Sequence, residues 1–212
     1  MARTIREKSI DRLLALYVID RCRTKHNIDN VSETKMQKLM FYSERKLNKC
    51  KCKALNYRFI KLLFPTFSSE LKTDLNELSQ LGFLNGPYFS EGQKAKMILE
   101  DFSQVFRDNR EIISIIDSEV DKYAPIPTEE LVKKTKRMRW RNKAIGGLTK
   151  GTPLVYPLKA ENARCLLEIS DEDYEDLAIC LSPEISAGMA QAFDELRRGK
   201  RLTHEEVFGE LC

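Results

Sequence analysis

SETKMQKLMFYSERKL, residues 32–47, gives the clearest signal of secondary structure in this chain. Ser32 can cap a helix, because its hydroxyl can accept a hydrogen bond from a backbone N–H of the first turn. Apolar residues then recur at helical spacing, and they are Met36, Leu39, Met40, Tyr42 and Leu47. We therefore expect an amphipathic helix here, followed by a basic loop over residues 49–53.

Helical patterns continue on both sides of this segment. An amphipathic helix is expected over residues 5–22, and Ser68 or Thr66 can cap another that ends near Gly82. Further helices are expected over residues 90–107, 110–123 and 128–135, and after the caps Ser170, Ser182 and Thr203. Only residues 55–63 alternate loosely, as a short strand does.

Glycine and proline are scarce, with 9 and 7 residues, whereas a β-sandwich or barrel needs more turn residues. The expected fold class is therefore mainly α, with at most a short β pair and a small helical C-terminal appendage. Small residues around Gly146, Gly147 and Pro153 interrupt the periodicity and predict a domain boundary. The expected domains are residues 1–145, a helical domain, and residues 146–212, an acidic C-terminal region.

The composition predicts a cytoplasmic protein. No apolar run approaches the roughly 18 residues of a membrane span, and the N-terminal residues 1–14 lack the apolar centre of a signal peptide. The six cysteines are scattered in a chain too long to depend on cross-links, so reduced thiols are expected.

Charge is distributed unevenly along the chain. Residues 1–60 hold 15 Lys/Arg against 6 Asp/Glu, a net +9, and residues 161–212 hold 5 against 13, a net −8. Such an asymmetry predicts either different partners for the two halves or one half that folds onto the other.

The residue types of an enzyme site are almost absent. The two histidines, His26 and His204, stand in polar surroundings near expected helix ends, and Cys50 and Cys52 have no second pair with which to bind zinc. The acidic run at residues 171–176 lacks the pattern of a calcium loop and instead fits the first turn of a helix. We expect no catalytic residue, no metal and no cofactor.

Two segments are compatible with nucleic-acid binding. Seven of the eleven residues 133–143 are Lys or Arg, around Trp140, which suits phosphate contacts with an aromatic platform, a solvated linker, or a surface facing the acidic tail. Residues 55–97 have the order of a winged helix, in which Ser69, Lys72, Thr73 and Asn76 would face operator DNA. A winged-helix-like transcriptional regulator is therefore the alternative function.

Three segments resemble motifs of the Panacea domain, found in the SocA-like antitoxin family. They are SETKMQKLMFY at residues 32–42, the aromatic YRF at 57–59 with FPTFSSEL at 64–71, and TEELV at 128–132 with Trp140. Phe64 departs from the family's glycine, and Lys136 stands where the family has histidine. The resemblance spans about residues 5–143 and implies a helical Panacea-like domain. The residues that carry it are Gln37, Lys38, Leu39, Tyr42, Pro65, Ser68, Leu71 and Trp140.

The C-terminal residues resemble the toxin-neutralising tail of many antitoxins. SPE at residues 182–184, GK at 199–200 and THEEV at 203–207 fit that pattern. Together the resemblances imply an antitoxin that neutralises a cognate protein toxin, with a homo-oligomer and operator DNA as further partners and no membrane. The expected toxin contacts lie on one apolar stripe: Leu177, Ile185, Met189, Phe193, Leu196, Val207, Phe208 and Leu211.

Overall fold

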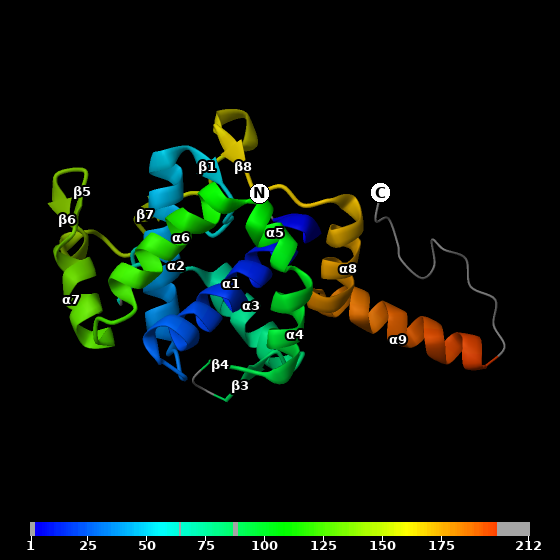
Figure 1. Cartoon of the computed structure of the whole chain (residues 1–212). Helices are drawn as coiled ribbons and strands as arrows, with labels where there is room; N and C mark the ends of the chain where they lie inside the picture. The colour runs from blue at the N-terminus through cyan, green and yellow to red at the C-terminus, as the bar shows by residue number, and fades with distance from the viewer. Residues whose placement is uncertain (1–2, 64, 87–88, 199–212) are drawn as a thin grey trace.

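The computed structural model of the chain describes residues 3–63, 65–86 and 89–198, which are mainly helical, as predicted (Figure 1). The helices are α1 (Ile5–His26), α2 (Glu33–Cys50), α3 (Ser69–Gln80), α4 (Gln93–Asp101), α5 (Ser103–Asp108), α6 (Arg110–Tyr123), α7 (Thr128–Arg137), α8 (Asp171–Leu181) and α9 (Pro183–Arg197). The strands are β1 (Cys52–Lys53), β2 (Phe59–Ile60), β3 (Leu84–Asn85), β4 (Ser90–Glu91), β5 (Arg139–Trp140), β6 (Lys143–Ala144), β7 (Pro153–Val155) and β8 (Cys165–Leu166). Two 3-10 segments, η1 (Ile145–Gly147) and η2 (Ala160–Asn162), complete the described elements.

Several helices begin at the serines that the sequence indicates. Ser32 Oγ accepts from the Lys35 backbone N–H at 3.2 Å, and Ser68 Oγ accepts from that of Leu71 at 3.3 Å. Ser170 likewise caps α8. These contacts satisfy N–H groups that have no partner within the helix, and they confirm the expected start of α2, α3 and α8.

Helix α1 runs through the middle of the molecule, where α3, α4, α6 and α8 pack against it (Figure 1). The consecutive residues 9–16 are all buried, so every face of this part of α1 is covered. A helix in that position is usually apolar all round. Asp11 and Arg12 are exceptions and therefore need partners inside the protein.

Arg12 lies at the centre of a buried ionic cluster. Its side chain pairs with Asp74 at 3.2 Å and with Glu77, and it donates to the backbone oxygen of Leu181. Asp74 also accepts from Arg3 and from the Tyr57 hydroxyl, at 2.6 and 3.0 Å. The cluster thus ties α1 to α3 and to the end of α8, 169 positions along the chain.

The described β structure consists of two-stranded ladders rather than an extended sheet. β3 pairs with β4 and β5 with β6 as antiparallel hairpins, whereas β1 pairs parallel with β8 and β2 antiparallel with β7. The last two ladders join segments about a hundred residues apart. They fix residues 153–166 along the side of α2.

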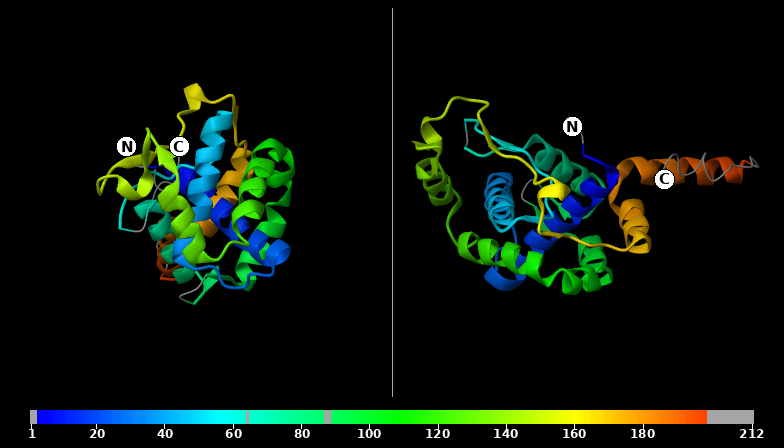
Figure 2. Two further views of the ribbon diagram at one scale, coloured as in Figure 1. Left: turned by 90° about the vertical axis from the view of Figure 1, so that its left-hand side faces the viewer. Right: turned by 90° about the horizontal axis from the view of Figure 1, so that it is seen from above.

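The expected boundary at residue 145 needs a correction for this reason. Leu154, Ile169, Leu177 and Leu181 belong to the same hydrophobic core as α1 and α2. Residues 146–181 are therefore part of the main body, because their apolar side chains are buried against it. Of the described C-terminal elements, only α9 extends away from the body (Figures 1 and 2).

The cysteines also differ from expectation. Cys52 and Cys165, aligned across the β1–β8 ladder, form a disulfide, while Cys22, Cys50 and Cys180 are free. Cys50 and Cys52 are close together in the sequence, but the disulfide joins Cys52 to Cys165, which is 113 positions away. The pairing depends on tertiary structure, which the local pattern does not contain.

Candidate functional site

Helices α8 and α9 form an angled pair at one end of the molecule (Figure 1). The Ser182 hydroxyl accepts from the Ile185 backbone N–H at 3.4 Å, and Pro183 occupies the first helical position, which needs no N–H donor. Ser186 Oγ donates to the Ile179 carbonyl at 3.0 Å and joins the two helices. Lys8 on α1 pairs with Glu184 at 3.4 Å. These contacts hold the start of α9 while the rest of the helix projects outward.

The expected toxin-binding stripe is divided by the structure. Leu177 is fully buried in the core and Ile185 is also buried, so neither side chain is available to a partner, contrary to the prediction. Met189 is half-buried, and Phe193 is 58% exposed. Leu196 lies in α9, and Val207, Phe208 and Leu211 lie outside the described residues. Among the stripe residues whose side chains the structure describes, Phe193 is therefore the one that is exposed.

A groove between α4 and α8 adjoins the start of α9. It has a volume of about 710 Å³, and its apolar wall includes Phe83, Met97 and Phe102. Met97 is 56% exposed, so its side chain offers apolar surface to a partner at this groove. The sequence did not single out Met97, because its position opposite α8 depends on tertiary packing.

The rim of this groove is acidic. Asp101 from α4 and Asp173 and Asp176 from α8 line it, with Lys94 as the cation among the described lining residues. The acidic run predicted as a helix start is therefore also one wall of an apolar groove. An apolar surface with carboxylates around it can bind a protein that presents apolar and basic side chains.

Gln37 of the first family motif and Ser68 of the second contact each other in the core. Gln37 Nε2 donates to the Ser68 carbonyl at 2.9 Å, and Gln37 Oε1 accepts from the Ser68 backbone N–H at 2.8 Å. Leu39, Pro65 and Leu71 are also buried. The α2 motif thus fixes the loop that precedes α3, and these residues serve packing.

Lys38 is buried next to this contact. Its side chain is 1% exposed, and its Nζ donates to the Thr66 carbonyl at 3.0 Å. Burial lowers the pKa of Lys38 to about 7, because the surrounding protein solvates the ammonium group poorly. Burial acts in the opposite direction on a carboxyl and raises the pKa of Asp11 to about 7, although Arg3 opposes the rise.

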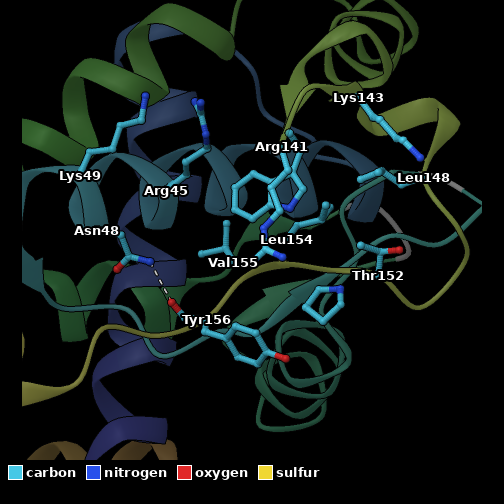
Figure 3. Close-up of a pocket in the computed structure, with 12 residues that line it drawn as sticks. Arg45, Asn48, Lys49, Arg141, Lys143, Leu148, Thr152, Leu154, Val155 and Tyr156 are labelled. Atoms are coloured by element: carbon cyan, nitrogen blue, oxygen red, sulfur yellow. Dashed lines mark hydrogen bonds between the residues drawn. The ribbon is translucent and has the colours of Figure 1, made fainter.

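Tyr42 connects α2 to the third motif. Its hydroxyl lies 3.0 Å from the Thr135 hydroxyl on α7, and its ring stacks on Tyr123 with centroids 3.8 Å apart. Helix α7 leads directly into the β5–β6 hairpin that carries Trp140. Trp140 lines a second pocket, with the cations Arg45, Lys49, Arg141 and Lys143 (Figure 3).

The segment predicted to resemble a winged helix does form helix, hairpin and helix in that order, as α3, β3–β4 and α4. Ser69, Lys72, Thr73 and Asn76 are exposed on α3, as a recognition helix requires. Only Lys72 is basic among them, so this face offers little electrostatic attraction to phosphate.

Within the described ranges, Cys52, Glu111 and Cys165 are the three residues whose ligand atoms lie close enough together to suggest a metal, within 4.8 Å. The two sulfurs are bonded to each other, so they do not offer thiolates. Glu111 pairs with Arg164 instead. No described helix is both long and apolar enough to cross a membrane.

Comparison with known proteins does not place the chain in a family. No family model, no curated protein and no solved structure matches it.

Proposed function

We propose that this chain is an antitoxin, which binds a cognate protein toxin directly through the α8–α9 end and neutralises it. The observation that carries the proposal is the projecting helix α9, which exposes Phe193, together with the apolar groove with an acidic rim that adjoins the start of this helix. Exposed aromatic side chains are frequent energetic anchors of protein interfaces. The resemblance to antitoxin tails begins at residues 182–184, which lie at this same end of the molecule.

The charge of this end indicates the kind of toxin surface that would fit. Asp101, Asp173 and Asp176 surround the groove, and Glu172 and Glu175 are exposed on α8. A toxin with a basic surface, such as one that acts on nucleic acid, would be attracted to these carboxylates. Neutralisation then needs no chemistry from this chain, because occupying the toxin's own site is sufficient.

The test uses point substitutions in the full chain. A cut near residue 150 would remove β7, β8 and α8 and open the core, so loss of binding would not identify the surface. Phe193→Asp changes an exposed side chain and should leave the fold intact. The protein is co-produced with the product of the gene adjacent to its own, and co-purification and rescue of growth are measured.

We expect Phe193→Asp to weaken binding by at least about tenfold, as loss of an interface anchor does, and to reduce growth rescue. Leu63→Asp is the matched control, because Leu63 is also an exposed apolar residue but lies in the loop after β2. Equal binding and rescue by wild type and Phe193→Asp would rule out this face as the toxin contact.

A further inference from the structure

The second pocket, which Trp140 lines, combines aromatic rings with several cations, and toxin binding at α8–α9 does not involve these residues. We propose that it binds single-stranded nucleic acid, with bases stacked on Trp140 and on Tyr156 and phosphates on the surrounding cations. Arg45 and Lys49 supply one side of the pocket, and Arg141 and Lys143 supply the other.

The fold builds this pocket from three segments (Figure 3). Arg45 and Lys49 are four residues apart, on one face of α2. Strand β7 forms the floor, held by its pairing with β2 and by Asn48 Nδ2, which donates to the Tyr156 carbonyl at 2.8 Å. The β5–β6 hairpin forms the opposite wall.

The hairpin turn sets the position of Arg141. Arg141 and Asn142 both have positive φ, 44° and 67°, as the two central residues of a type I′ turn do. Ile145 anchors the hairpin base, because it is fully buried and its backbone N–H donates to the Met138 carbonyl at 2.8 Å. Arg141 is thereby held at the tip of a supported hairpin.

The charge of the pocket favours an anion. No acidic side chain lines it, and none of its four cations forms an ion pair with a carboxylate in the described part of the chain. Four uncompensated cations around one concave surface repel each other, and a phosphate-bearing ligand relieves that repulsion.

The charge also extends well beyond the pocket, which favours a polymer over a small anion. Residues 131–160 contain nine Lys/Arg and no Asp or Glu. Lys133, Lys134, Lys136 and Arg137 are exposed on α7 next to the hairpin. A strand that places one base in the pocket can therefore continue along α7 with its phosphates facing cations.

The shape and the aromatic residues favour a single strand over a duplex. The pocket has a volume of about 720 Å³ and a largely apolar floor that includes Leu154 and Val155. Tyr156 is 57% exposed and Trp140 is half-buried, so both rings offer surface for stacking. An unpaired base can enter such a pocket and stack, whereas a base within a duplex cannot leave its own stack without a cost.

This site is distinct from the proposed toxin contact. The β5–β6 hairpin and α9 lie at opposite ends of the molecule in Figure 1 and in the right-hand view of Figure 2. The proposal therefore stands or fails independently of the antitoxin proposal.

The chain provides its own probe, because Trp140 is its single tryptophan. A uridine 12-mer is titrated into the full-length protein, and Trp140 fluorescence and the anisotropy of the end-labelled strand are followed together. We expect the strand to quench Trp140, and the affinity to fall with salt at a logarithmic slope of about −3, as four phosphate contacts to a single strand predict.

Two variants test the pocket directly. Lys49→Glu/Lys143→Glu changes one exposed cation on each wall and should lower the affinity by at least about tenfold and reduce the salt slope. Trp140→Ala should weaken binding by about five- to a hundredfold through lost stacking. Lys72→Glu/Lys96→Glu, on α3 and α4, makes the same charge change outside the pocket and should bind the strand about as tightly as wild type.

Four results would overturn the proposal. Three are unchanged Trp140 fluorescence at saturating strand, unchanged affinity in the Lys49→Glu/Lys143→Glu variant, and a duplex of the same length that binds as tightly as the single strand. A loss confined to Lys72→Glu/Lys96→Glu would also overturn it and would place the nucleic acid on α3.

Discussion

Replacing Lys38 with methionine should change how the stability of the protein depends on pH. Lys38 is buried with Thr66 as its hydrogen-bond partner, and burial lowers its pKa to about 7 from the ordinary 10.5. Above pH 7 the folded protein therefore holds Lys38 neutral, whereas the unfolded chain keeps it protonated up to about pH 10.5. Unfolding takes up a proton throughout this window, so the free energy of unfolding rises with pH across it.

The size of the effect follows from the two pKa values. One pKa unit corresponds to about 1.4 kcal/mol, so the window of about 3.5 units is worth about 5 kcal/mol in total. Half of the folded molecules already hold the neutral form at pH 7, and the expected gain between pH 7 and pH 9 is about 2 kcal/mol. Lys38→Met has no proton to lose and should not show this gain.

Urea unfolding at pH 7, 8 and 9 measures the difference. Lys38→Met also removes the hydrogen bond to Thr66, but that loss is the same at each pH. The quantity to compare is therefore the change with pH, which should be about 2 kcal/mol smaller in the variant than in wild type. Lys72→Met, an exposed lysine on α3, is the control and should follow wild type. Parallel curves for wild type and Lys38→Met would refute the assignment of a neutral buried amine.

Two further substitutions test the buried ionic cluster around Arg12 and the tight turn at Gly92. Asp74→Asn removes the charge that faces Arg3 and Arg12 and should lower the free energy of unfolding by about 3 kcal/mol, because Arg3 and the buried Arg12 each lose one carboxylate partner; a urea midpoint close to that of wild type would contradict this. Gly92→Ala places a Cβ 2.9 Å from the carbonyl oxygens of both Gly82 and Phe83. It should therefore lower the free energy of unfolding by about 1–3 kcal/mol, whereas an unchanged urea midpoint would show that this turn can move.

The helices could be predicted from the sequence because their signals are local. Ser32, Ser68 and Ser170 each stand at the first position of a periodic segment, and each caps the helix that follows. The extent of the main body could not be predicted in this way. The residues around Gly146 do interrupt the helical pattern, but β7 then pairs with β2 and β8 with β1, and the local pattern does not encode these contacts.

The same distinction between local signals and tertiary contacts applies to the residues of the two candidate sites. The sequence indicated Phe193 and Trp140 because each stands within a recognisable segment, an amphipathic helix and a basic run. It did not indicate Met97 or Tyr156, which complete the two pockets, because each belongs to a segment that meets its neighbours only in the folded chain. The sequence also assigned Leu177 to a partner surface, but this residue is buried in the core. An apolar stripe has the same sequence pattern whether it faces the core or a partner.

The uneven charge of the chain has a similar explanation. The sequence left two interpretations open, separate partners for the two halves or contact between them. Contact accounts for part of the asymmetry, because Arg6 pairs with Asp171 at 3.0 Å and Lys8 with Glu184. It does not account for the cations of residues 133–143, on α7 and the β5–β6 hairpin, which lie at the end of the molecule opposite α9 (Figure 1). Each end therefore keeps a surplus of one sign, and that surplus is what a basic protein at one end and an anionic strand at the other would neutralise.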